Sequence, residues 1–253
     1  MCVLAFAWNA HPRWKLVLAG NRDEFHARPA VALARWDGPD DLIAGRDLQS
    51  GGTWLGVSGR GRLAVVTNLR GYGGPDPDRA SRGALVTDML SGTGDYGDPD
   101  NAPLEAFNPF NLIVAGPGQA RFLSNRPQAT RATLTHGVYG LSNGGLDEPW
   151  PKLLQIKAFM FDWLTGGADD PHALFEGLRS ETLPAVGIAP STPSDAPREP
   201  KDSPIFIRDN VYGTRCSTVV AIDRDGAGLI AERRFTPAGE AAGDSAIRFS
   251  WPV

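Results

Sequence analysis

Short apolar runs separated by turn-forming residues dominate the pattern along the chain. Val3 to Trp8 and Trp14 to Ala19 each have the length of a strand, and the Asn and Pro between them predict a β-hairpin. A second hairpin is expected near the C-terminal end, where 217–223 and 228–234 flank an Asp-Gly turn. Further runs of strand length are 53–58, 63–67, 111–115, 121–124 and 138–142. The pattern therefore predicts a mostly antiparallel sheet structure.

Helical periodicity is restricted to three segments. Residues 150–164 place apolar side chains at helical spacing and are followed by two glycines, which end a helix. A shorter helix is expected over 171–178, opened by a proline at its first position, and a third over 79–90. The proline-rich segment 190–204 is expected to be a loop, because strands lie on both sides of it. We therefore predict a single α+β domain over residues 1–253.

Composition narrows the class of protein. A chain of 253 residues, 42% of them hydrophobic, is long enough to bury a substantial core. No apolar run approaches the ~18 to 20 residues of a membrane span, and the N-terminus lacks the basic start of a secretory signal. The formal net charge of −4 gives no basic footprint for nucleic acid. We therefore expect a cytoplasmic protein without a nucleic-acid partner, and its oligomeric state stays open.

Metal and disulfide chemistry are not expected. Cys2 and Cys216 cannot build a disulfide scaffold and do not form a CxxC pair. An apolar run follows Cys216, which favours burial of that thiol. The histidines lack the spacing of metal ligands; they are His11, His26, His136 and His172. We expect neither a metal ion nor an organic cofactor.

The second residue is the first candidate for chemistry. Methionine aminopeptidases remove an initiator Met when the next residue is small, as cysteine is. Cys2 would then carry a thiol and a free α-amine, whose reference pKa of ~7.7 to 8.0 makes it a usable general base. One residue would supply both the nucleophile and the base. The alternative is a small apolar residue that opens a strand.

A polar run follows the second expected strand, and it reads Asn21, Arg22, Asp23 and Glu24. In an antiparallel hairpin the end of the second strand lies beside the start of the first, so Arg22 and Asp23 are expected near Cys2. A guanidinium lowers the pKa of a thiol, and a carboxylate can orient an ammonium group. The alternative is a solvated turn held by an ion pair.

Together these residues resemble the NRDE family, whose animal members are called transport-and-Golgi-organisation proteins. Cys2 stands at the family's distance before Asn21-Arg22-Asp23-Glu24, and other matching motifs follow in family order. These motifs are Gly51-Gly52-Thr53-Trp54-Leu55-Gly56, Val66-Thr67-Asn68-Leu69-Arg70, Ser81-Arg82-Gly83, Phe110-Asn111-Leu112, Gly140-Leu141-Ser142-Asn143 and Tyr212-Gly213-Thr214-Arg215. The resemblance covers nearly the whole chain.

The NRDE family in turn resembles the N-terminal-nucleophile hydrolases of the choloylglycine hydrolase and penicillin V acylase type. This resemblance implies a four-layer αββα sandwich of two antiparallel sheets. It also implies cleavage of a non-peptide amide, or of a thioester, through an acylated Cys2, with Asp23 orienting the amine. The acylase motif reads Arg-Asn-x-Asp, so Arg22 departs from its register. Asn68 and Asn143 resemble the active-site amides that hold the oxyanion, and Arg215 resembles a late supporting arginine.

Each of these residues also has an interpretation without catalysis. Asn68 and Asn143 are typical of turns, and Arg215 is typical of a structural ion pair. Trp54 and Trp150 are typical of a core.

A second hypothesis is a binding or trafficking protein that keeps the fold without the chemistry. Its ligand would be haem, lipid or acyl-CoA, as the association of animal family members with Golgi organisation and secretion, lipid or acyl-CoA homeostasis and haem handling implies. A haem would need an axial ligand such as His26 or His136. Under either hypothesis we expect loops 71–80, 92–106 and 185–204 to form the pocket walls, and nothing in them identifies the ligand.

Overall fold

The computed structural model describes residues 3–38, 40–192, 195 and 202–252. Within these residues the first sheet has the strand order β10-β1-β2-β11-β12-β13, and every pair of neighbours is antiparallel. Its strands are β1 (Val3–Trp8), β2 (Trp14–Phe25), β10 (Gly137–Leu141), β11 (Tyr212–Asp223), β12 (Ala227–Phe235) and β13 (Ala241–Ser250).

The second sheet follows chain order from β3 to β9, and it is also antiparallel throughout its described strands. Its strands are β3 (Ala30–Arg35), β4 (Leu42–Asp47), β5 (Leu55–Ser58), β6 (Arg62–Asn68), β7 (Phe110–Ala115), β8 (Ala120–Ser124) and β9 (Thr130–Leu134).

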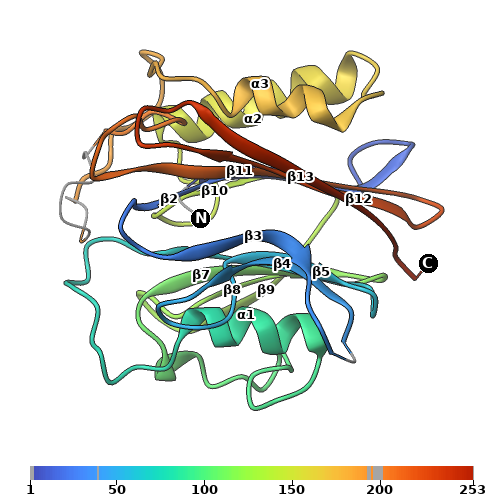
Figure 1. The fold of residues 1–253 in the computed structure, drawn as a ribbon, viewed down its shortest axis with the longest axis vertical. Coiled ribbons are helices and arrows are strands. Elements are labelled where there is room, and N and C mark those ends of the chain that lie inside the picture. The colour runs from blue at the N-terminus through green and yellow to red at the C-terminus, as the bar shows by residue number, and fades with distance from the viewer. Residues whose placement is uncertain (1–2, 39, 193–194, 196–201, 253) are drawn as a thin grey trace.

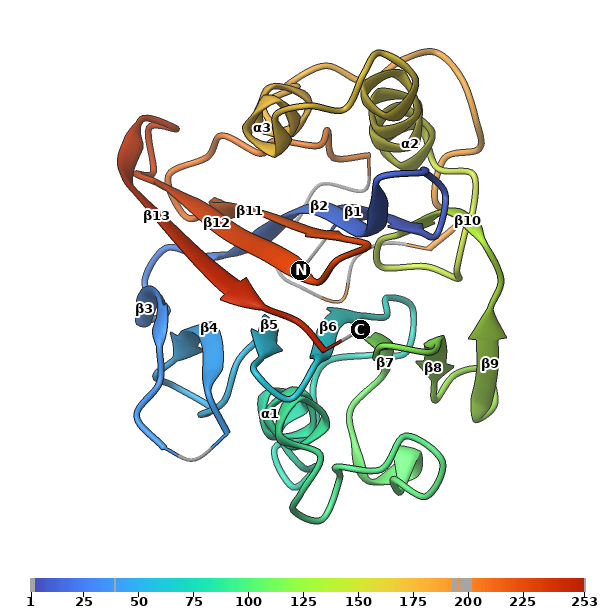
Figure 2. The ribbon, with the colours of Figure 1, turned by 90° about the vertical axis from the view of Figure 1, so that its right-hand side faces the viewer.

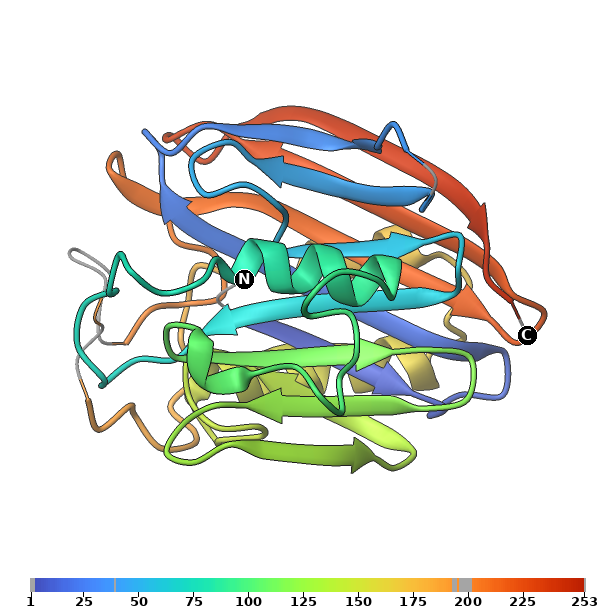
Figure 3. The ribbon, with the colours of Figure 1, turned by 90° about the horizontal axis from the view of Figure 1, so that it is seen from below.

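Helices cover the outer faces of both sheets, which gives four layers (Figure 1). Over the first sheet lie α2 (Pro151–Thr165) and α3 (Leu174–Gly177), and over the second lies α1 (Arg82–Ser91). Figure 2 shows the same order of layers after a quarter turn, and Figure 3 shows α1 lying along the middle strands of the second sheet. Two short 3-10 turns are η1 (Leu104–Ala106) and η2 (Pro171–Ala173). The expected αββα sandwich is confirmed.

Alternation along β1 shows why its sequence is apolar at every position. Leu4 and Phe6 belong to the core between the two sheets, whereas Val3 and Ala5 belong to the core under α2 and α3. A strand covered on both faces needs apolar side chains at successive positions, and this one has them throughout. The helical layer meets this second core through side chains of α2 such as Ile156.

Contact between two of the family motifs fixes the start of α1. Ser81 caps the helix, its hydroxyl accepting a hydrogen bond from the Gly83 backbone amide at 3.2 Å. Gly52 packs directly on Gly83, because a Cβ at Gly52 would lie 2.2 Å from the Gly83 carbonyl carbon. Gly52 also has a φ of +73°, which disfavours any other residue. Two motifs separated along the chain therefore form one backbone contact between α1 and the segment before β5.

Several element boundaries differ from the expectation. The second strand of the first hairpin runs on to Phe25, so it is longer than the expected Trp14 to Ala19, and the polar run Asn21–Glu24 lies within the strand instead of following it. The helix expected over 171–178 is a 3-10 turn followed by the four-residue α3. Strands β3, β4, β9 and β13 were not predicted; β13 and β9 are mostly exposed edge strands without an apolar run. No helix among the described residues is long and apolar enough to cross a membrane.

Candidate functional site

The start of β1 lies between strands β2 and β10, and polar residues from both of these segments of the chain come close to it. Val3 pairs with Asn21 of β2, and on the other side the register with β10 ends two residues before Asn143. Because both neighbours run antiparallel to β1, Asp23 and Asn143 come to opposite flanks of the start of this strand. Cys2 precedes Val3 in the sequence and lies outside the described residues. The topology thus gathers the expected polar side chains at the end of the sandwich where β1 begins.

Asn21 connects the first sheet to the layer above it. Its side chain is fully buried, and Nδ2 donates to the carbonyl oxygens of Leu178 at 2.9 Å and Ile205 at 2.8 Å. Its Oδ1 accepts a hydrogen bond from the Ser217 hydroxyl at 2.7 Å. These partners come from the end of α3, from the segment before β11 and from β11 itself. Asn21 therefore holds three separate segments together, a structural role in the strand.

Asp23 is oriented by a hydroxyl on the neighbouring strand. It is 4% exposed, and its Oδ1 accepts a hydrogen bond from Thr214 Oγ1 at 2.6 Å. The same hydroxyl accepts from the Ile207 backbone amide at 2.9 Å, so its proton is directed at the carboxylate. The carboxylate of Asp23 is therefore buried and fixed in direction, and the solvated turn that was the alternative for this motif is excluded.

Arg22 lies on the opposite face of β2, between the two sheets. Its guanidinium stacks on the ring of Trp54, with Cζ 4.3 Å from the ring centroid, and its Nη2 lies 3.2 Å from Oδ2 of Asp47. Glu24 is a more distant partner, 3.8 Å away. Trp54 is buried, as expected, and it packs in the inter-sheet core while it carries this cation. The structure therefore separates Arg22 from Asp23, which faces the helical layer.

Asp47 is the centre of the ion-pair network around Arg22. Its Oδ2 also accepts from Arg28 Nε at 2.7 Å, and its Oδ1 accepts from the backbone amides of Gln49 and Ser50, each at 3.0 Å. Burial acts to raise the pKa of Asp47, but the hydrogen bonds from Arg28 and Ser50 and the two guanidinium charges outweigh it. The pKa of Asp47 is therefore lowered, and the carboxylate stays charged beside Arg22.

Arg215 occupies a bulge in β11, where the register with β2 shifts between Thr214 and Cys216. The guanidinium donates to the carbonyl oxygens of Phe25 at 2.8 Å and Arg28 at 3.0 Å. Burial, and secondarily the charge of Arg22, lowers the pKa of Arg215. These bonds hold the backbone that follows β2, so its described hydrogen bonds go to carbonyl groups rather than to a carboxylate.

Cys216 is the buried thiol that the sequence predicts. Burial raises its pKa well above the usual range, and the neighbouring charge of Glu232 acts in the same direction. Burial likewise raises the pKa of Glu232, whose Oε1 accepts from the Leu33 backbone amide at 3.0 Å. This pair stabilises the contact between β12 and β3 and is a poor source of thiolate.

A hydrogen bond joins the two candidate oxyanion residues, from the side chain of Asn143 to the backbone of Asn68. Asn143 is 4% exposed, and its side-chain Nδ2 donates to the backbone carbonyl oxygen of Asn68 at 3.0 Å. The backbone carbonyl oxygen of Asn143 accepts from the Arg70 backbone amide at 3.0 Å. Asn68 is exposed at the end of β6 in the second sheet. These bonds join the ends of the two sheets, and each Nδ2 group has two hydrogens, so Asn143 retains one for another acceptor.

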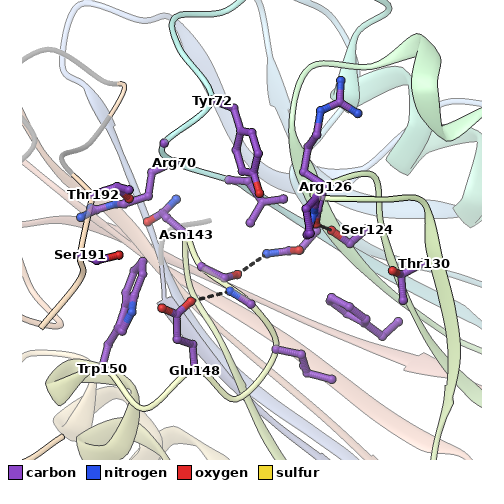
Figure 4. Close-up of a pocket in the computed structure, with 18 residues that line it drawn as sticks. Arg70, Tyr72, Ser124, Arg126, Thr130, Asn143, Glu148, Trp150, Ser191 and Thr192 are labelled. Atoms are coloured by element: carbon purple, nitrogen blue, oxygen red, sulfur yellow. Dashed lines mark hydrogen bonds between the residues drawn. The ribbon is translucent and has the colours of Figure 1, made fainter. Parts of the chain in front are cut away.

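A cavity of about 430 Å³ opens beside Asn143 (Figure 4). In this view Arg70, Asn143, Glu148 and Trp150 lie on one side of it, and Ser124 and Thr130 lie on the other. Its remaining lining residues are Leu69, Gly71, Tyr72, Asn111, Phe122, Arg126, Pro127, Gly144, Gly145, Leu146, Ser191 and Thr192. The loops expected at 71–80 and 185–204 contribute to this wall, whereas 92–106 does not.

Several residues of this end of the sandwich were not predicted from the sequence. Thr214, Ser217 and Asp47 act only through the side chains that they orient, and no spacing rule identifies such partners. Trp150 was predicted as core; it is 3% exposed and also lines the cavity. Asn111, from the motif Phe110-Asn111-Leu112, is likewise both buried and part of the cavity wall, and it is 1% exposed.

Comparison with known proteins confirms the family resemblance over nearly the whole chain. The family model described as Transport and Golgi organisation 2 matches residues 1–237. The Transport and Golgi organization protein 2 homologs of Bos taurus and Homo sapiens are each 33% identical over 258 residues, covering 92% of this chain and 92% of the relative. Among solved structures, a cysteine-to-alanine mutant of conjugated bile acid hydrolase from Clostridium perfringens has a TM-score of 0.53 at 8% identity, covering 98% of this chain and 92% of that one. That likeness shows a shared fold, and the family match shows the lineage: the chain belongs to the Transport and Golgi organisation 2 family, built on the sandwich of the N-terminal-nucleophile hydrolases.

Proposed function

We propose that the chain is an N-terminal-cysteine hydrolase that cleaves a non-peptide amide or a thioester through an acyl-Cys2 intermediate. The observation that carries this proposal is the placement of Asp23 and Asn143 on the two flanks of the start of β1. A buried, oriented carboxylate and an amide donor are the groups that a terminal amine and a developing oxyanion require. The fold shared with a hydrolase that carries a cysteine-to-alanine mutation supports the choice of cysteine.

The proposed reaction proceeds in two steps. After removal of Met1, the α-amine of Cys2 takes the proton from the thiol, and the sulfur attacks the carbonyl carbon of the substrate. Collapse of the tetrahedral intermediate breaks the bond to the leaving group, which takes the proton from the ammonium. A water molecule, deprotonated by the same amine, then hydrolyses the acyl-sulfur bond and restores the thiol.

The other candidate residues have supporting roles in this proposal. Asp23 would hold the ammonium, and the free Nδ2 hydrogen of Asn143, together with Asn68, would donate to the oxyanion, an effect worth about 3 to 4 kcal/mol of barrier per donor. Arg22 or Arg215 would lower the thiol pKa. Arg22 is the more deeply buried of the two, and a buried cation keeps a stronger field than an exposed one. A thiol nucleophile also fits a reducing compartment such as the cytoplasm.

The first experiment is the intact mass of the protein as purified. A mass short by one Met would establish the free Cys2 amine; a retained Met1 would contradict the mechanism for this chain. The processed protein is then screened against acyl amides for amine release, with Cys2→Ala as the matched inactive variant. We expect complete loss of turnover in Cys2→Ala with an unchanged circular dichroism spectrum, and full activity in that variant would refute the proposal.

A second candidate function is ligand binding without catalysis, which the cavity itself favours. Leu69, Phe122, Leu146 and Trp150 give its wall apolar area for a lipid or acyl chain. Haem has less support, because no histidine is among the described lining residues, and His26 directs its Nε2 at the Asp209 carbonyl 3.0 Å away. Relatives named for transport and Golgi organization are consistent with a carrier. Saturable binding of an acyl ligand that Cys2→Ala leaves unchanged, without turnover, would favour this function.

A further inference from the structure

Strand β13 forms one edge of the first sheet, and no strand in the described part of the chain pairs with its outer side (Figure 2). The strand is ten residues long, from Ala241 to Ser250, and it contains neither proline nor lysine, two residues that commonly protect sheet edges. A long edge without such protection can pair with a strand of another molecule.

The hydrogen-bond register shows which backbone groups of β13 point outward. The Trp251 amide donates to the Gly226 carbonyl at 2.7 Å, and the pairing with β12 is unbroken from Ser250 back to Gly243. In an antiparallel pair every second residue exchanges both bonds with its partner, so the odd-numbered residues bond to β12 and the even-numbered ones face the open side. Arg248 fits this register, because its carbonyl accepts a hydrogen bond from a side chain of the other sheet, Arg35 Nη2 at 3.1 Å.

The side chains of the outward residues share one face of the strand and are complementary in charge. Asp244, Ala246 and Arg248 are all exposed. Asp244 Oδ2 lies 2.9 Å from Arg233 Nη2 on β12, whereas Arg248 has no ion-pair partner among the described residues. The acid and the base stand two positions on either side of Ala246. A second β13 that runs antiparallel about Ala246 therefore brings each Asp244 opposite an Arg248.

We propose that β13 pairs with the β13 of a second copy of this chain across a two-fold axis at Ala246, which joins two six-stranded sheets into one. The two Ala246 residues exchange both of their backbone hydrogen bonds, and each Asp244–Arg248 pair does the same. The Arg248 carbonyl has a second lone pair, so the bond from Arg35 can remain. This dimer is independent of the proposed function.

Sedimentation velocity of the full-length protein, at concentrations up to about 0.5 mM, tests for the dimer. Ala246→Pro removes the central N–H, which points away from β12, so the variant should fold as the parent does by circular dichroism. We expect a monomer–dimer equilibrium in the parent and a dimer at least about 10-fold weaker in Ala246→Pro. A parent that is monomeric at every concentration, or a dimer that Ala246→Pro leaves unchanged, would overturn the proposal.

Charge exchange tests the register and needs no proline. Arg248→Asp places carboxylates opposite each other at both ends of the pair and should weaken the dimer about 10- to 100-fold. Asp244→Arg should weaken it as well, because two guanidinium groups then meet. The double variant with both changes restores opposite charges and should recover most of the affinity. Equal affinity in the parent and both single variants, or no recovery in the double variant, would contradict this register.

Cross-linking tests the position of the axis in a Cys2→Ala background, where the remaining native cysteine, Cys216, is buried. In Ala246→Cys the two new thiols lie on facing residues with Cα atoms about 5.5 Å apart, which suits a disulfide. In the control, Ser250→Cys, the two copies are eight strand positions apart, about 27 Å. Mild oxidation should cross-link the first variant and not the second. Equal cross-linking of both, or of neither, would overturn the proposal.

Discussion

Replacing Asn21 by leucine tests whether the first residue of the Asn21–Glu24 motif is a structural side chain. Leucine has nearly the same volume, so it removes the polar atoms without opening a large cavity. The change deletes three hydrogen bonds and leaves the carbonyl oxygens of Leu178 and Ile205 and the hydroxyl of Ser217 without this partner. All three positions are in the buried layer under α3, where solvent cannot replace the two lost donors and the lost acceptor.

The expected cost follows from that geometry. A buried polar group left without a partner costs about 1 to 3 kcal/mol, so three such losses, partly relieved by relaxation, give about 3 to 6 kcal/mol. Ser217→Ala is the matched control, because it removes only one of the three bonds and should cost about 1 kcal/mol. Total stabilities of single domains are about 5 to 15 kcal/mol, so the Asn21→Leu loss is large enough to measure and small enough to leave a folded population.

Urea unfolding followed by tryptophan fluorescence gives both free energies. We expect the midpoint of Asn21→Leu to fall well below that of Ser217→Ala, with the slope against urea concentration unchanged. An Asn21→Leu protein as stable as the Ser217→Ala protein would refute the reasoning, because the two carbonyl bonds would then contribute nothing.

The remaining predictions concern backbone contacts and titrating groups. Gly51 and Gly52 have similar positive φ angles of +70° and +73°, but a Cβ meets nothing within 4 Å at the first and lies 2.2 Å from the α1 backbone at the second. Thermal unfolding should therefore show a loss of about 1 kcal/mol for Gly51→Ala and a clearly larger loss for Gly52→Ala; equal losses would contradict the contact. Because the pKa of Asp47 is lowered in the native state, its contribution to stability is full above its ordinary pKa of 3.8 and is lost as the pH falls through its folded pKa. Asp47→Asn should consequently reduce the urea midpoint more at pH 7 than at pH 3, and a pH-independent reduction would count against the pairing with Arg28. The pKa of Glu232 is raised, so its charged form is disfavoured as the pH rises above 4.5. Glu232→Gln should match the parent at pH 4 and exceed its stability at pH 8, and a variant that is less stable at pH 8 would disprove this. Burial of Cys216 predicts that iodoacetamide labels it only after unfolding, which peptide mass mapping with and without urea will decide.

The apolar strands that line both cores could be predicted from the sequence because they are covered on two faces. Val3–Trp8, Leu55–Ser58 and Phe110–Ala115 are buried at every position, and continuous apolar runs mark such strands. The edge strand β13 has mostly exposed or half-buried residues and forms only by pairing with β12, which no local signal announces. The four-layer arrangement came from the family resemblance and not from periodicity.

The sequence predicts that Arg22 and Asp23 lie near the start of β1, but it does not predict the directions in which their side chains point. The hairpin argument predicts Arg22 and Asp23 near the start of β1, where Asn21 pairs with Val3, but it ends the second strand at Ala19, whereas β2 continues to Phe25. Polar residues usually end a strand; here Asn21 and Asp23 find buried partners at Ser217 and Thr214, so the strand continues. Those partners are nearly two hundred positions away in the chain. Which face each side chain takes follows only once β2 is known to extend to Phe25.

The position of β2 in the middle of the first sheet has a consequence for how the chain folds during synthesis. Its central residue Leu18 pairs with Val220, roughly two hundred residues later, and contacts between such distant segments make folding slow. Until residues 212–223 have left the ribosome, one edge of β2 has no partner strand, and Asp23 and Asn21 lack the hydroxyls that orient them. Premature termination before β11 would therefore leave an open, apolar edge strand that is prone to aggregate. We expect the nascent chain to bind chaperones until β11 has been synthesised.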